Sequence, residues 1–321
     1  MASIDTQTDK GGAKAARFPL DWREWLASEA ARPALLILLG VAVAYWSFWP
    51  ALYDLFQSPD GYYSHGFLVP LIAAFIVYRC WPLLKAGDWL WFLGGFAKRL
   101  YEKNPKLQGL KAKPFWPALL LLPAVLLFNY ASTLLKIEGF QSVGLLALLL
   151  VGIWFVAGGR WMVALSLPVL YLAFALPLWT TFINNTTNPL QVASTTVAYH
   201  VLRLLGFDPY QSDPTIIQLN HFTLDVGVPC SGLKLLLALT AFTVFFILIA
   251  RLNWVGNLVM AALIVPLSLL INGLRVALIG MVGDHYGPQA GHAFHDYSGY
   301  ITLIICFFVV FKIARLLGWK E

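Results

Sequence analysis

Three polar residues in the C-terminal half of the chain are of types that together can carry out acyl transfer: Cys230, Arg275 and His295. Cys230 follows a long polar stretch and precedes the apolar run 235–250, so we expect it at the N-terminus of a membrane-spanning helix. The partial positive charge of a helix N-terminus favours the thiolate, which is the form of cysteine that attacks carbonyl carbon. Lys234 lies four residues further on, and we expect it on the same helix face, where its charge would add to this effect.

Arg275 and His295 offer the other two parts of such a site. A guanidinium stays charged, and its donors suit an oxyanion or a substrate carboxylate or carbonyl. Because an arginine within the apolar stretch 271–280 is costly unless it faces a polar cavity, we treat Arg275 as a functional candidate; the alternative is an interfacial anchor. A histidine takes and returns a proton near neutral pH. His285 and His292 are rivals in the same loop, and His295 is favoured because it lies nearest the last apolar run.

Composition places these residues in a membrane protein. The chain has 321 residues, of which 59% are hydrophobic and 12% charged, and its mean hydropathy is +0.71, which excludes a soluble globular class. We attribute the net charge of +6 to cytoplasmic loops, and we expect no nucleic-acid partner. The three cysteines lack the spacing of a disulfide framework, and the scattered histidines predict no metal site and no cofactor.

The apolar runs predict an all-α polytopic fold with about eight transmembrane helices. We expect these helices at 34–49, 66–84, 115–135, 140–157, 161–178, 231–250, 254–274 and 298–317. Residues 1–32 are predicted to be a cytoplasmic tail that ends in an interfacial helix from residue 18, and residues 33–321 to form one integral membrane domain. The basic loop 85–114 is predicted to lie at the cytoplasmic interface.

The external loop 179–229 is expected to hold two elements. Asn188 and Pro189 are typical of a helix start, and apolar residues then recur at helical spacing up to Gly206, which predicts an amphipathic helix on the membrane surface. The segments 215–219 and 222–226 flank Asn220 and His221, which predicts a small β-hairpin directly before Cys230.

The distribution of basic residues predicts the orientation. With both termini in the cytoplasm, the cytoplasmic segments hold 18 of the 22 lysines and arginines. This orientation, derived without the candidate residues, puts Cys230, Arg275 and His295 on the external face at three helix ends. Asp296 or Asp284 could orient a histidine. Since neighbouring residues of a helix point in different directions, a pair between Asp296 and His295 predicts a non-helical backbone there.

The motifs that carry these residues resemble the exosortase/archaeosortase family of membrane cysteine peptidases. The motifs are Pro229-Cys230-Ser231-Gly232-Leu233-Lys234, then Asn272-Gly273-Leu274-Arg275, then His295 before the last apolar run, and Tyr63-Ser64-His65-Gly66-Phe67-Leu68 upstream. The resemblance covers 62–311. Archaeal relatives tend to carry arginine at the position of His295, so the bacterial branch is indicated. The resemblance implies Cys230 as nucleophile, Arg275 as the arginine of the triad and His295 as base.

The same resemblance implies a function at the periplasmic face of a bacterial inner membrane. Exosortases are thought to cleave C-terminal sorting signals of the PEP-CTERM kind, and they often occur alongside exopolysaccharide production. The expected partners are exported proteins with such a signal, the lipid bilayer, and a glycan or another acceptor nucleophile. Four further residues are expected to bind substrate or support the site: His65, Lys234, Asn272 and Ser231. For His65 the alternative is a helix-capping residue, and for Lys234 an interfacial lysine.

Other functions remain open at this point. A transporter or scaffold for polysaccharide export would use Arg275 and His65 to line a path. A lipid-linked glycosyltransferase is less favoured. That class usually needs acidic residues in the first external loop, and this chain offers only Asp54 and Asp60 there. A thiol oxidoreductase would need a second cysteine near Cys230.

Overall fold

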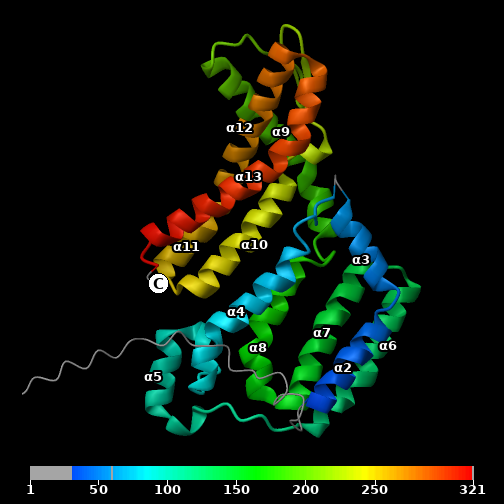
Figure 1. Cartoon of the computed structure of the whole chain (residues 1–321), viewed down its shortest axis with the longest axis vertical. Helices are drawn as coiled ribbons and strands as arrows, with labels where there is room; N and C mark the ends of the chain where they lie inside the picture. Colours follow the sequence, from blue (N-terminus) through cyan, green and yellow to red (C-terminus); the bar gives the residue numbers. More distant parts are fainter. Residues whose placement is uncertain (1–30, 59–60, 320–321) are drawn as a thin grey trace, which may run out of the picture.

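A computed structural model describes residues 31–58 and 61–319. The fold is helical, with one small sheet, which confirms the predicted all-α polytopic class (Figure 1). The predicted tail and interfacial helix lie outside the described residues, apart from the last residues of the tail, with which α2 begins. The division into a tail and one integral domain stays a prediction.

The first part of the described chain contains α2 (Ala31–Ala44), α3 (Phe48–Gln57), α4 (Leu68–Lys85), α5 (Gly95–Lys103), α6 (Leu122–Leu134), α7 (Glu138–Ala157) and α8 (Gly159–Tyr171). The second part contains α9 (Thr180–Leu204), strands β1 (Tyr210–Asp213), β2 (Ile216–Gln218) and β3 (Thr223–Asp225), and then α10 (Leu233–Ala250), α11 (Trp254–Ala262), α12 (Ile264–Tyr286) and α13 (Pro288–Leu316). Short 3-10 turns join several of them, among them Trp116–Leu121 before α6 and Val228–Cys230 before α10.

Within the described residues, 6 helical segments are long and apolar enough to cross a membrane. They are Leu68–Lys85, Trp116–Leu134, Glu138–Ala157, Val228–Ala250, Trp254–Tyr286 and Pro288–Leu316. Two shorter helices occupy the remaining expected positions, namely α2 and the apolar helix Gly159–Phe174. The predicted hairpin between α7 and α8 is present, and Gly158 makes its turn with φ +89°. The expected count of about eight spans therefore agrees with the fold.

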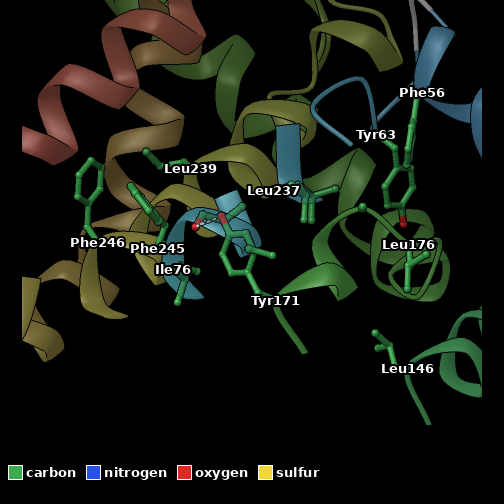
Figure 2. Close-up of a cluster of buried hydrophobic side chains, with 14 of the residues drawn as sticks. Phe56, Tyr63, Ile76, Leu146, Tyr171, Leu176, Leu237, Leu239, Phe245 and Phe246 are labelled. Carbon is green, nitrogen blue, oxygen red and sulfur yellow. Dashed lines mark hydrogen bonds between the residues drawn. The ribbon is translucent and has the colours of Figure 1, made fainter. Parts of the chain in front are cut away.

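Helix α10 forms the centre of the bundle. It is apolar on all sides, as expected of a helix surrounded by other helices, and it packs against α4, α12 and α13. Figure 2 shows Leu237, Leu239, Phe245 and Phe246 from α10 in the buried cluster. The Tyr171 hydroxyl donates a hydrogen bond of 3.0 Å to the carbonyl of Ala241 in the middle of α10. Because α10 is packed on several sides, the position of the loop before it, which contains Cys230, is well defined.

The predicted hairpin before Cys230 is confirmed, and it is part of a three-stranded antiparallel sheet in the order β1-β2-β3. Ile217 pairs with Leu224, and both side chains are buried. We did not predict β1, because all its side chains are exposed and its sequence shows no apolar alternation.

The predicted start of the amphipathic helix is wrong. Helix α9 begins at Thr180, and Pro189 lies inside it rather than at its first position. Proline in a helix interior removes one backbone hydrogen bond, so local preference favoured a start at Pro189. Tertiary contact outweighs this preference: Ile183 is buried in the main core, and Tyr62 approaches Thr187 with 3.4 Å between the hydroxyl oxygens.

Candidate active site

Cys230 closes a 3-10 turn that precedes α10, so it lies before the helix rather than in its first turn. Gly232 separates the two with φ +85°, a left-handed conformation that L side chains rarely adopt. The predicted placement of Cys230 and Lys234 on one helix face is therefore wrong, because the helix begins only at Leu233. A Cβ atom on Gly232 would lie 2.8 Å from the Asn272 side-chain nitrogen, so the loop and α12 are in direct contact here.

The side chains of Asn272 and Ser194 form hydrogen bonds to the backbone of the loop that contains Cys230. The Asn272 Nδ2 donates to the carbonyl of Cys230 at 2.8 Å and to the hydroxyl of Ser194 at 3.0 Å. The Ser194 hydroxyl in turn donates to the carbonyl of Ser231 at 3.1 Å. Both side chains are buried, where an unpaired polar group is costly, so this set of contacts fixes the loop backbone. We did not predict Ser194, which lies in the middle of α9.

Arg275 links α12 to the helix that carries His295. Its Nε donates to the hydroxyl of Ser298 at 2.9 Å, and its Nη2 donates to the carbonyl of His295 at 3.1 Å. The Ser298 hydroxyl also donates to that carbonyl at 3.1 Å. Arg275 is therefore oriented by two partners on α13, and we did not predict the part that Ser298 takes.

His295 and Asp296 form a pair on α13, with 3.2 Å between Nδ1 and Oδ1. Both residues lie within the helix, so the prediction that such a pair needs a non-helical backbone is wrong. Nδ1 is the ring nitrogen nearer the backbone, and a short carboxylate one residue on can reach it. The His295 side chain is 28% exposed, and that of Asp296 77%. A carboxylate that accepts from Nδ1–H leaves Nε2 free to take a proton.

A cavity of about 360 Å³ lies where these elements meet. Its polar lining consists of Lys234, Asn272, Arg275, His295, Asp296 and the backbone around Pro229 and Gly232, and its other wall consists of Leu235 and the α13 residues Tyr297, Gly299, Tyr300, Thr302 and Leu303. Among the described residues, His295 is the histidine that lines this cavity. His285 instead contacts Tyr286, and His292 contacts Phe222.

The Cys230 side chain lies behind the cavity lining. It is only 8% exposed and packs in a second apolar cluster with Leu224, Val226 and Val276. The charge of a Cys230 thiolate nevertheless acts on the Arg275 guanidinium, so the two groups lie within electrostatic reach. Pro229 and Gly232, on either side of the Cys230–Ser231 pair, do line the cavity. The thiol therefore lies next to the cavity without lining it.

His65 lies in the turn before α4, outside the cavity lining. It is 9% exposed and stacks on Tyr63 with 6.5 Å between the ring centroids. Neither ring nitrogen has a hydrogen bond of good geometry within the described part of the chain. Burial lowers the pKa of His65 to about 4, the Phe174 carbonyl opposes this shift, and the charge of Lys234 adds to it. Lys234, which lines the cavity, is therefore within electrostatic reach of His65.

Asp284 does not orient any of the candidate histidines. Its Oδ1 accepts from the backbone N–H of His221 at 2.6 Å, and 3.8 Å separate it from the His221 Nδ1. This contact fixes the turn between β2 and β3 to the end of α12. Within the described residues, no group of three or more His, Cys, Asp or Glu side chains converges.

The fold and the cavity define a multi-pass helical membrane protein in which an arginine and a histidine line one cavity and a cysteine lies behind that lining. The family model described as transmembrane exosortase matches residues 56–312, so the chain belongs to the transmembrane exosortase family. No curated protein and no solved structure matches the chain. The predicted family is thereby confirmed, and the roles of the individual residues stay predictions.

Proposed function

We propose that this exosortase is a cysteine peptidase or transpeptidase that cleaves C-terminal sorting signals of exported proteins. The carrying observation is the cavity in which Arg275 and His295 meet the backbone on either side of Cys230. Acyl transfer by cysteine requires a thiolate, a group that stabilises the oxyanion and a group that carries the proton. Lys234, Arg275 and His295 line the cavity in front of the buried Cys230 and suit these requirements.

In this mechanism the Cys230 thiolate attacks the scissile carbonyl carbon, and the electron pair of the C=O bond moves onto oxygen. Arg275 stabilises that oxyanion or holds a substrate carboxylate. When the C–N bond breaks, protonated His295 gives its proton to the leaving amine, and a thioester forms. Water or an acceptor nucleophile then attacks the thioester, His295 takes the incoming proton, and the thiolate leaves.

The shape of the cavity supports a substrate that enters from the bilayer. The α13 part of its lining runs from His295 to Leu303, a rise of about 12 Å along the helix. This wall lies in the apolar span Pro288–Leu316. A membrane-spanning sorting signal would lie along it, with its recognition motif beside Arg275. We place this end of the bundle in the periplasm and both termini in the cytoplasm of a bacterial inner membrane, on the charge distribution of the loops.

One observation favours a second function. Cys230 is buried and does not itself line the cavity, whereas Arg275 and Lys234 do. A non-enzymatic transporter or scaffold for exopolysaccharide export would use such cationic groups without a nucleophile. It predicts that Cys230→Ser has no effect on the cellular process.

The two functions are separated by intact mass measurements on purified protein incubated with peptides that carry candidate sorting signals. Wild type, Cys230→Ala and His295→Ala are compared, with Cys306→Ala as the matched cysteine control. The peptidase predicts a thioester adduct on wild type and Cys306→Ala that is absent from Cys230→Ala. If several signals are tested and none gives an adduct or a cleavage product, the transporter or scaffold is favoured.

A further inference from the structure

A second cavity of about 490 Å³ lies at the opposite end of α10 from the first. Helices α4 and α10 run side by side (Figure 1), with 5.9 Å between the ring centroids of Phe75 and Phe245. Residues near the C-terminal end of each helix line this cavity. Arg79 from α4 and Arg251, the residue that ends α10, both line it. Two exposed arginines from distant parts of the sequence therefore border one cavity.

Among the described residues, no carboxylate lines the cavity beside these two arginines; Asp88 lies within electrostatic reach of the lining residue Cys80 but is not part of the lining. The cavity lining contains no Asp or Glu, and both ion pairs found within the described residues are His–Asp pairs. The C-terminal ends of α4 and α10 each bring a partial negative charge of about half a unit. The two positive charges of the lining exceed that sum, so the lining itself favours an anion.

The backbone conformation of Arg251 is unfavourable for an arginine, which indicates a functional role for its side chain at this cavity. Arg251 ends α10 in the left-handed conformation, with φ +50° and ψ +43°. This position at a helix end is normally occupied by glycine or asparagine, because other residues adopt it at a cost. Cys80, whose buried thiol lies within electrostatic reach of Arg251, lines the same cavity.

The remaining lining is apolar and indicates the rest of the ligand. Leu83, Leu248 and Ile249 line the cavity together with the two arginines. The cavity lies at the end of two apolar helices of 18 residues each, about 27 Å long, which is close to the thickness of a bilayer core. A ligand at this depth has a negatively charged group at the headgroup level and a hydrocarbon part next to it.

We propose that this cavity binds an anionic phospholipid. Arg79 and Arg251 hold the phosphate oxygens through charge-assisted hydrogen bonds, to which the planar guanidinium fork is suited. The glycerol and upper acyl region lie against Leu83 and Leu248. The site is separate from the proposed peptidase cavity and does not depend on that function.

The test is native mass spectrometry and thermal unfolding of the full chain in neutral detergent. Phosphatidylglycerol, phosphatidylcholine or inorganic phosphate is added to wild type, to Arg79→Gln, to Arg251→Gln and to the double variant. The matched control is Lys98→Gln/Lys103→Gln, which removes two exposed charges from α5, outside the cavity lining. The single variants keep the proposal testable if the double variant does not fold.

The proposal predicts that wild type and the control retain phosphatidylglycerol and unfold at a higher temperature with it. Each arginine variant should bind it at least about tenfold more weakly, because a charge-assisted hydrogen bond is lost. Phosphatidylcholine should have a smaller effect, and inorganic phosphate none. Equal retention by the double variant, or equal loss in the lysine control, overturns the site. Equal stabilisation by inorganic phosphate overturns the lipid as its ligand.

Discussion

Polar side chains serve different purposes in two regions of the molecule. Around the cavity with Arg275, they join segments that are far apart in sequence: Asn272 reaches Cys230, and Ser194 reaches Ser231. In α6 and α7, the hydroxyls of Ser132, Thr133 and Ser142 donate to carbonyls four residues earlier in their own helices. Asn129 is an exception in this region, because its amide donates to the carbonyl of Ala44 in α2.

The two regions therefore depend on different kinds of interaction for their structure. The α6–α7 region is held mainly by apolar packing, which tolerates substitutions of similar volume. The cavity region depends on paired polar groups, where removal of one partner leaves the other buried and unsatisfied. Substitutions in the first region should lower the free energy of unfolding, and those in the second should lower activity as well. The following predictions test this contrast.

The largest effect is expected at Cys230. Cys230→Ala should lower the rate of signal cleavage at least about a thousandfold, because the nucleophile is lost. Cys306→Ala, at a fully buried position in α13, should leave the rate within about twofold of wild type and lower only stability. Cleavage is measured on a reconstituted substrate. Comparable rates for Cys230→Ala and wild type would remove Cys230 from the mechanism.

The next effect concerns the acid stability of the region around His65. Its folded pKa of about 4 lies below the ordinary value of 6.5, so the unfolded state binds the extra proton between these pH values. Stability should be unaffected above pH 6.5 and fall by about 3 kcal/mol as pH drops towards 4. His65→Phe should lack this part of the loss, whereas the exposed His285→Gln should retain it. Equal pH dependence of His65→Phe and wild type in denaturant unfolding would contradict the assignment.

A matched pair of asparagines tests the contrast directly. Asn272 and Asn129 are both buried and both donate to backbone carbonyls, Asn272 to Cys230 at 2.8 Å and Asn129 to Ala44 at 3.1 Å. Either change to Leu should cost about 1–3 kcal/mol of stability. Only Asn272→Leu should also lower the cleavage rate, by about 10- to 100-fold, since the loop backbone shifts. If both variants lose the rate equally, the two regions do not differ as described.

The smallest effect is expected from two glycines with positive φ. Gly232→Ala meets Asn272 at 2.8 Å in addition to its backbone strain, whereas a Cβ atom on Gly287 meets nothing within 4 Å. Gly287→Ala should cost about 1 kcal/mol and leave the cleavage rate unchanged. Gly232→Ala should cost more and reduce the rate severalfold, as seen in unfolding and cleavage measurements. Identical results for both would show that the contact with Asn272 is unimportant.

Much of this arrangement could be predicted from the sequence, because it depends on local patterns. Apolar runs predicted the spans, and two short segments around a turn predicted the β2–β3 hairpin. The orientation derived from the basic residues stays a prediction, and its placement of Arg275 and His295 at helix ends is wrong, because α12 continues to Tyr286 and α13 begins at Pro288. The break at Gly232 could not be inferred, since its positive φ depends on close contact with α12. Ser194 was missed because a serine in a polar helix carries no signal until its partner is known. The burial of Cys230 and the meeting of Arg79 with Arg251 are likewise tertiary properties.

Left-handed residues at both ends of α10, Gly232 and Arg251, have a consequence for bilayer thickness. A helix bounded in this way cannot gain a turn at either end, so its helical length of 18 residues is fixed. A thicker or thinner membrane must then be matched by tilt or by deformation of the lipid around the bundle. The Cys230 loop precedes α10 directly. The acyl-chain length of the lipids therefore changes the depth at which this loop lies in the membrane. Cleavage in vesicles of graded thickness should pass through a maximum.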